Sequence, residues 1–284
     1  MIDNETLEKV YSDIFEEKPP ALKTGFHDID CYLSNIDNFC LITIGGRPAM
    51  GKTCFMTNIM LNILEQNQKC LYFSLEMSAE QLIKRLLGTI GEVDSHLLKM
   101  PSEISKRTQS IEKIVKAIEK ISKYDLTILD EMVTVENIIE QIEKDKPKFV
   151  FIDMLQLINV SNIKSHSESL EEIVLLLKKI AKDNNCIVFI SSPLSRAVES
   201  RRDKRPMLSD LKECGVLANI SDIVMLIYRD EYYKPYCSDD DYAINKGEAE
   251  IILAKNKYGP VGTIKLLFRS SIMKFFNPIK TDVF

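Results

Sequence analysis

Short apolar runs alternate with amphipathic stretches over most of the chain. Five apolar runs have the length of buried strands, near 41–45, 69–74, 125–129, 148–153 and 186–191. Apolar residues recur at helical spacing over 52–66, 78–90, 103–123, 134–144 and 167–184. Strands that alternate with helices in this way form a mostly parallel sheet with helices on both faces. The pattern therefore predicts an α/β fold.

From about residue 222 onward, strand-like segments follow one another without long helices between them, at 222–228, 248–255, 261–268 and 271–276. Polar or turn-forming residues separate them, including 239–241 and 257–260. Such connections favour antiparallel hairpins at the end of the sheet. Because the sequence shows no internal repeat, we expect one domain over residues 21–284, preceded by an N-terminal appendage of residues 1–20.

The appendage has the pattern of an amphipathic helix over residues 3–17. Its apolar residues fall on one face, and two prolines then end the helix: Leu7, Val10, Tyr11, Ile14 and Phe15, followed by Pro19 and Pro20. A helix this short is marginal alone, so its apolar stripe must dock on another surface. The surface is either its own domain or a neighbouring subunit.

Net charge and apolar content limit the classes of partner. The 284-residue chain has a formal net charge of -5, which excludes a uniformly basic nucleic-acid-binding surface. Any contact with DNA must therefore be local. No apolar run approaches the roughly 20 residues that span a bilayer, and the N-terminus is acidic where a signal peptide is basic. We expect a cytoplasmic protein that is neither secreted nor membrane-spanning.

The seven cysteines agree with that expectation, because they form no C-x-x-C pair and have no histidine at metal-binding spacing. Several lie within apolar runs. They indicate reduced core thiols.

A complete G-x-x-x-x-G-K-T loop lies between the first apolar run and the first helical stretch, at residues 46–53. Its glycines let backbone N–H groups point at phosphates, Lys52 reaches the β- and γ-phosphates, and the Thr53 hydroxyl completes a Mg²⁺ shell. The sequence thus predicts ATP and Mg²⁺ as cofactors. The predicted nucleotide-binding residues are Gly46, Arg47, Pro48, Ala49, Met50, Gly51, Lys52, Thr53 and Cys54.

Two carboxylates follow predicted strands. Asp153 ends the apolar run 149–153, where it would be a second partner of Mg²⁺, and the alternative is a helix N-cap. Glu76 follows the strand after the first helix. Because the ends of parallel strands face one crevice, Glu76 is a candidate to polarise a water near the γ-phosphate, and the alternative is a solvated cap.

Residues 196–205 concentrate positive charge, with five cations against two anions. A basic loop that leaves the carboxyl end of a strand is well placed to hold a nucleic-acid backbone. The alternative is an ordinary solvated loop.

The order of motifs resembles the C-terminal ATPase domain of the bacterial DnaB-type replicative helicases. The strings Ser-Leu-Glu-Met at 74–77 and Asp-Met-Leu-Gln-Leu at 153–157 are the most specific of them. The resemblance covers about residues 20–276 and rests on 24–30, 46–53, 73–78, 152–157, 194–199, 209–211 and 228–233.

The resemblance implies a RecA-like P-loop NTPase fold, six-membered rings, and 5′ to 3′ movement along single-stranded DNA as ATP is hydrolysed at subunit interfaces. It makes Glu76 the hydrolytic base, places Arg85 near the nucleotide, and brings Lys255 and Lys257 into the neighbour's site. The implied DNA contacts are Arg196, Lys212, Glu213 and Gly215. A primase or a helicase loader is an implied partner, and the N-terminal helix is similar to the linker helix that packs on the adjacent subunit.

Two departures from the family pattern bear on activity. Pro193 stands where the family usually has a glutamine that senses the γ-phosphate, and proline has no amide side chain for that role. Lys257 replaces the arginine that acts in trans and lacks its planar two-pronged geometry. The family's N-terminal collar has no counterpart here, which indicates a natural short form or a fragment. Three functions stay open: a DNA-translocating motor, a regulator that binds ATP and DNA with little turnover, and a non-helicase RecA-like ATPase.

Overall fold

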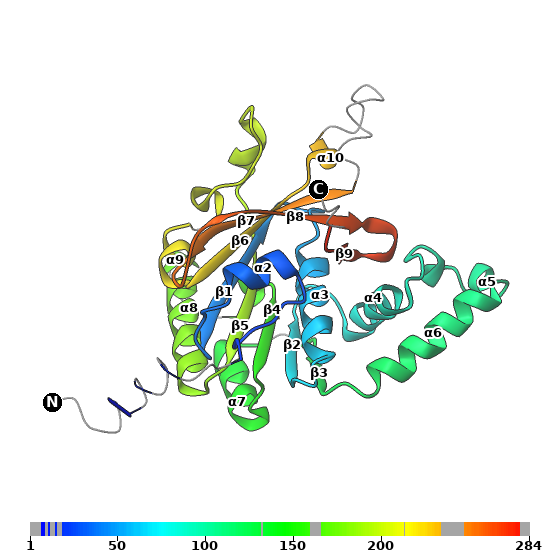
Figure 1. Cartoon of the computed structure of the whole chain (residues 1–284), viewed down its shortest axis with the longest axis horizontal. Helices are drawn as coiled ribbons and strands as arrows, with labels where there is room; N and C mark the ends of the chain where they lie inside the picture. Colours follow the sequence, from blue (N-terminus) through cyan, green and yellow to red (C-terminus); the bar gives the residue numbers. More distant parts are fainter. Residues whose placement is uncertain are drawn as a thin grey trace.

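A twisted sheet forms the centre of the computed structural model (Figure 1). The structure describes Leu7, Glu8, Tyr11, Phe15 and residues 19–131, 133–159, 166–212, 214–233 and 247–278. Within these residues the sheet has nine strands in the order β3-β2-β4-β5-β1-β6-β7-β8-β9.

The first six strands in the chain run parallel, and the last three are antiparallel. The parallel strands are β1 (Cys40–Gly46), β2 (Cys70–Ser74), β3 (Leu126–Leu129), β4 (Phe149–Asp153), β5 (Ile187–Pro193) and β6 (Ile223–Tyr228). The antiparallel strands are β7 (Glu248–Asn256), β8 (Gly262–Arg269) and β9 (Lys274–Phe276). This arrangement confirms the predicted mostly parallel sheet with C-terminal hairpins. The strand expected over 271–276 is shorter, because the 3₁₀ turn η5 (Ser270–Ile272) precedes it.

Helices cover both faces of the sheet. One face packs on α2 (His27–Tyr32) and α3 (Lys52–Leu64), and the other on α7 (Val135–Asp145), α8 (His166–Asp183) and α9 (Cys214–Ile220). Helix α4 (Ala79–Gly91) contributes Leu82 and Leu86 to the first of these cores from beside the sheet (Figure 1). The parallel strands are apolar on both sides, as such burial requires. In β1, Ile42 and Ile44 enter the first core and Leu41 enters the second.

The charged stretch predicted as one helix over 103–123 is two helices, α5 (Pro101–Ile104) and α6 (Thr108–Ile121). Arg107, the N-cap of α6, has a non-helical backbone and interrupts the helical path. In Figure 1, α4 and α6 lie beside the sheet rather than on it. Ala117 is the single fully buried residue of α6, and three apolar side chains on α6 are exposed: Ile111, Val115 and Ile118.

Most of the predicted N-terminal helix lies outside the described residues. The apolar positions that are described, Leu7, Tyr11 and Phe15, are all exposed. Docking of this segment on a neighbouring subunit and the boundary at residue 20 stay predictions.

Four of the described cysteines are at least partly buried, and Cys31 is exposed. Burial raises the pKa of the Cys186 thiol to about 11. Cys214 has no described side chain, and Cys237 lies outside the described residues. Among the described residues we find no helix that is long and apolar enough to span a membrane.

Parallel pairing brings the ends of four strands to one edge of the sheet. Gly46 of β1 pairs with Pro193 of β5, and Ser74 of β2 pairs with Asp153 of β4. Segments far apart in the sequence therefore meet where the phosphate-binding loop begins.

Candidate nucleotide and DNA site

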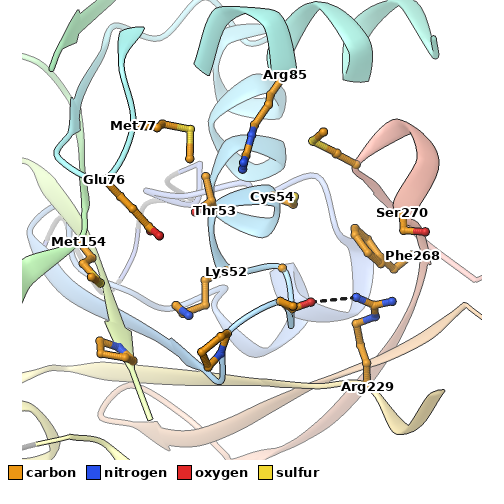
Figure 2. A pocket seen from close by; sticks show the side chains of 15 residues that line it. Lys52, Thr53, Cys54, Glu76, Met77, Arg85, Met154, Arg229, Phe268 and Ser270 are labelled. Atoms are coloured by element: carbon orange, nitrogen blue, oxygen red, sulfur yellow. Dashed lines mark hydrogen bonds between the residues drawn. The ribbon is translucent and has the colours of Figure 1, made fainter. Parts of the chain in front are cut away.

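The phosphate-binding loop connects the end of β1 to the start of α3. Gly51 has a φ of 97°, a left-handed conformation in which a side chain would be strained. The loop borders a cavity of about 430 Å³ that has the size of a small-ligand site (Figure 2). Six of the predicted loop residues line the cavity: Pro48, Ala49, Gly51, Lys52, Thr53 and Cys54.

Three of the predicted loop residues do not line it. Gly46 ends β1 beneath the loop, and the Met50 side chain is buried in the core. The guanidinium of Arg47 turns away from the cavity toward Leu194 and Glu199. Any contact of Met50 and Arg47 with phosphate would therefore use the backbone.

Lys52 holds its ammonium against the loop itself. Its Nζ donates to the Gly46 carbonyl at 2.9 Å and to the Arg47 carbonyl at 3.4 Å. Burial lowers the pKa of Lys52, and the nearby carboxylates of Asp153 and Glu76 oppose that shift. The lysine is therefore a desolvated cation at the floor of the cavity.

Asp153 is buried and accepts hydrogen bonds from three hydroxyl groups. Thr53 Oγ1 donates to Oδ2 at 2.7 Å, Tyr72 Oη donates to the same oxygen at 3.1 Å, and Ser191 donates to Oδ1. The 3₁₀ turn η2 (Leu155–Leu157) that follows has no side-chain cap, so Asp153 is not an N-cap. The carboxylate instead fixes the orientation of the Thr53 hydroxyl.

Glu76 projects from the end of β2 into the cavity (Figure 2). Ser78 is the N-cap of α4, and its side chain accepts from the Gln81 N–H at 3.3 Å. Glu76 is therefore not the cap. Its carboxylate is exposed and makes no hydrogen bond to another described residue.

Two arginines add positive charge to the cavity wall. Arg85 reaches down from α4, as the resemblance implied (Figure 2). Arg229, at the end of β6, was not predicted as a site residue. Its guanidinium lies 4.4 Å from the centre of the Phe268 ring, donates to the Ala49 carbonyl at 3.2 Å and forms an ion pair with Glu231. Its buried Nε has no hydrogen-bond partner among the described residues. The one feature of the sequence that could have predicted Arg229 as a site residue is its position directly after an apolar strand.

The basic segment lies beyond the same edge of the sheet, and ion pairs divide its charges. Arg201 forms a fork with buried Asp210, with contacts of 3.1 and 2.6 Å, and Arg205 forms one with buried Glu250, with contacts of 2.7 and 2.6 Å. Arg196 is exposed and pairs with no described carboxylate. Fewer positive charges are therefore available to a ligand than the five cations in the sequence would suggest.

A second segment lies against the first one. The Lys212 N–H donates to the Pro193 carbonyl at 3.3 Å, and the Ser195 N–H donates to the Asp210 carbonyl at 2.7 Å. Lys212 is exposed, and a side chain added at exposed Gly215 would meet no atom within 4 Å. Glu213 lies outside the described residues. The structure thus brings Arg196 and Lys212 to neighbouring segments.

Lys255 and Lys257 lie away from the cavity of their own chain. Lys255 Nζ donates to the Ala218 and Asn219 carbonyls, at 2.7 and 2.8 Å, at the end of α9. Lys257 Nζ lies 3.8 Å from an Asp222 carboxylate oxygen. Neither residue lines the nucleotide cavity.

Most of the sequence matches a family model that agrees with this geometry. The model for the DnaB-like helicase C-terminal domain matches residues 21–277. The chain belongs to this family. The replicative DNA helicase DnaB of Rickettsia typhi is 40% identical to it over 90% of this chain and 57% of that protein. That of Geobacillus stearothermophilus is 36% identical, over 90% of this chain and 56% of that protein. The chain thus spans little more than half the length of these DnaB relatives.

Solved DnaB-like domains share the fold. One of them, a solved ATPase domain, aligns over 97% of this chain and 99% of that chain, with a TM-score of 0.89 and 32% identity. A DnaB-like replicative helicase, from a structure that describes its interactions with primase, covers 98% of this chain and 67% of that one, with a TM-score of 0.86 and 31% identity. These alignments confirm the RecA-like fold.

Pro193, where the resemblance implies a glutamine, lies at the wall of the cavity. It ends β5, while its carbonyl holds the Lys212 N–H. Pro193 therefore connects the cavity to the segment that bears Lys212 through a backbone hydrogen bond, because proline has no side-chain amide that could do so.

Proposed function

We propose that this chain is the ATPase part of a DNA helicase, which hydrolyses ATP with Mg²⁺ and moves 5′ to 3′ along single-stranded DNA. The observation that carries the proposal is the shared sheet edge. There the phosphate-binding loop and the carboxylates Asp153 and Glu76 lie beside the segments that bear Arg196 and Lys212.

Nucleotide binding would use the start of α3 and three cations. The phosphates would meet the backbone N–H groups of the loop and the positive end of the helix. Lys52 would exchange its carbonyl contacts for the β- and γ-phosphates. Arg85 and Arg229 line the same cavity. Arg85 would balance remaining negative charge, and Arg229 would do so in part, because it also pairs with Glu231.

The residues at the cavity floor fit a Mg²⁺ ion, because hydroxyl and carboxylate oxygens are its preferred ligands. Thr53 and Asp153 would hold it. Bound there, Mg²⁺ would neutralise phosphate charge and polarise the phosphoryl oxygens. Asp153 accepts a hydrogen bond from the Thr53 hydroxyl, which would leave the lone pairs of the Thr53 oxygen available to the ion.

Glu76 would act as the general base. Its free carboxylate in the cavity can accept a hydrogen bond from water and then its proton, as attack on the γ-phosphate proceeds. Arg196, Lys212 and the exposed backbone at Gly215 would hold the DNA backbone, and Glu213 stays part of that prediction.

Oligomerisation would complete the site. Lys255 and Lys257 are remote from their own cavity, which supports a role at a neighbour's nucleotide. Apolar side chains exposed on the N-terminal segment and on α6 support association of copies, and we propose a six-membered ring. A primase or a helicase loader is a proposed partner, and the cytoplasm the proposed location.

Steady-state ATP hydrolysis with Mg²⁺, with and without single-stranded DNA, tests the proposal. Lys52→Ala supplies the blank because it removes the phosphate-binding cation. We expect turnover well above the blank and stimulation by DNA. Turnover equal to the blank in both conditions would contradict a motor.

Two observations favour a second function, that of a regulator that binds ATP and DNA with little turnover. Pro193 offers the cavity no amide, and the amine of Lys257 already faces Asp222. A regulator would bind a fluorescent ATP analogue and a DNA oligonucleotide, while its hydrolysis stayed at the level of Lys52→Ala.

A further inference from the structure

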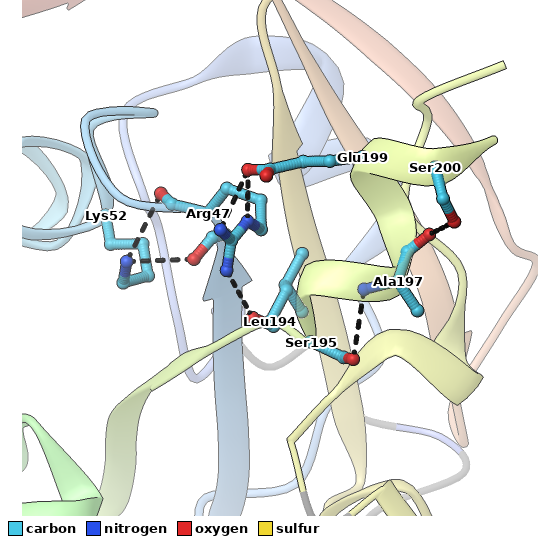
Figure 3. Close-up of polar contacts among 8 residues, drawn as sticks. Arg47, Lys52, Leu194, Ser195, Ala197, Glu199 and Ser200 are labelled. Atoms are coloured by element: carbon cyan, nitrogen blue, oxygen red, sulfur yellow. Dashed lines mark hydrogen bonds and ion pairs between the residues drawn. The ribbon is translucent and has the colours of Figure 1, made fainter. Parts of the chain in front are cut away.

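Arg47 belongs to the phosphate-binding loop, but its side chain joins the loop to the basic segment (Figure 3). Its Nε and a terminal nitrogen donate to one Glu199 carboxylate oxygen, at 2.9 and 2.8 Å, and the other terminal nitrogen donates to the Leu194 carbonyl at 2.8 Å. The Arg47 side chain is 13% exposed and that of Glu199 is 44% exposed. Two of the three guanidinium nitrogens are thus committed to the basic segment and the third to Leu194, just before it.

The backbone of the same arginine faces the nucleotide side. Lys52 Nζ contacts the Gly46 and Arg47 carbonyls, and these are the contacts that phosphate binding would replace. Figure 3 shows the lysine and Glu199 on opposite sides of Arg47. A change in the lysine's partners therefore acts on the peptide that carries the guanidinium.

The partners of the Arg47 guanidinium, Glu199 and Leu194, belong to the segments that carry the predicted DNA-binding residues. Glu199 shares the 3₁₀ turn η3 (Arg196–Ser200) with Arg196. Leu194 forms a β-bridge with Leu211, next to Lys212. A shift of Arg47 would therefore move the turn that bears Arg196 and the segment that bears Lys212 together.

We propose that Arg47 is the positioning residue that couples nucleotide occupancy to DNA binding, with Glu199 as its partner, in a chain whose position 193 has no side-chain amide. The inference rests on the proposed function. Arginine suits the role because its planar fork fixes orientation as well as charge.

Coupling between two ligands is reciprocal, and typical couplings change affinity by about 5- to 150-fold. The test measures the affinity for a non-hydrolysable ATP analogue with Mg²⁺, with and without a single-stranded oligonucleotide, in wild type and in Glu199→Gln. We expect DNA to raise analogue affinity at least about 5-fold in wild type and less than about 2-fold in Glu199→Gln. Analogue affinity without DNA should stay unchanged, because Glu199 does not line the cavity.

Asp203→Asn is the matched control. Asp203 lies in the same segment and contacts Arg205, with no contact to the phosphate-binding loop. Each substitution removes one negative charge from the basic segment, so any electrostatic gain in DNA affinity, measured without nucleotide, should be the same in both variants. Asp203→Asn should nevertheless keep the wild-type coupling between DNA and the ATP analogue.

The two hypotheses fail differently. Wild type in which DNA does not change analogue affinity would overturn this inference together with the motor. Wild-type coupling that persists in Glu199→Gln would overturn the role of the ion pair alone. Equal loss of coupling in Asp203→Asn would also overturn it, because general charge in the segment would then be the cause.

Discussion

The variant Tyr72→Phe removes one of the three hydroxyl groups that donate to buried Asp153. It tests how much this hydrogen bond contributes to the stability of the fold. The side chain of Tyr72 is fully buried, and Oη donates to the carboxylate at 3.1 Å. The phenylalanine would keep the ring and its stacking on Phe151, whose centre is 6.0 Å away. The substitution therefore deletes little besides the hydrogen bond.

The expected cost follows from the charge of the acceptor. A hydrogen bond to a charged group contributes about 1.5–3 kcal/mol, because the carboxylate cannot recover water when it is buried. Thr53 and Ser191 still donate to Asp153 in the variant, so we expect the free energy of unfolding to fall within this range and the fold to persist.

Urea denaturation of the nucleotide-free protein measures the change, read as a shift in midpoint at constant slope. Tyr233→Phe is the control, because the Tyr233 hydroxyl is buried without a partner among the described residues. It should change stability by less than about 0.5 kcal/mol. A Tyr72→Phe loss no larger than that of the control would refute the reasoning.

Three further predictions concern the cavity, the basic segment and the thiols. Glu76→Gln should keep ATP affinity and abolish turnover, because the amide cannot accept the proton; a calorimetric titration beside a phosphate-release assay checks this, and unchanged turnover would remove Glu76 from the mechanism. Arg196→Ala should weaken binding to single-stranded DNA and flatten its salt dependence, while Lys84→Ala on α4 should do neither. Burial raises the pKa of Cys186 to about 11, so its maleimide labelling in the folded protein at pH 7 to 8 should stay far below that of exposed Cys31; equal rates would contradict the burial.

The local sequence determined the elements and the chemistry that lies within one element. Apolar runs with both faces hydrophobic predicted the parallel strands, and the phosphate-binding loop was complete in eight consecutive residues. The helix break near Arg107 was missed, because periodicity continues across it. The short helices α2 and α9 were also missed, since too few residues carry their pattern.

Contacts between distant segments were decided by the tertiary structure alone. Tyr72 and Ser191 meet Asp153 because parallel pairing aligns three strand ends, and no spacing along the chain encodes that meeting. The basic segment read as five cations, yet two of them are held by carboxylates from elsewhere in the fold. Arg47 read as a phosphate-loop residue, but its direction depends on Glu199, 152 positions away, because a side chain takes the partner that packing brings within reach.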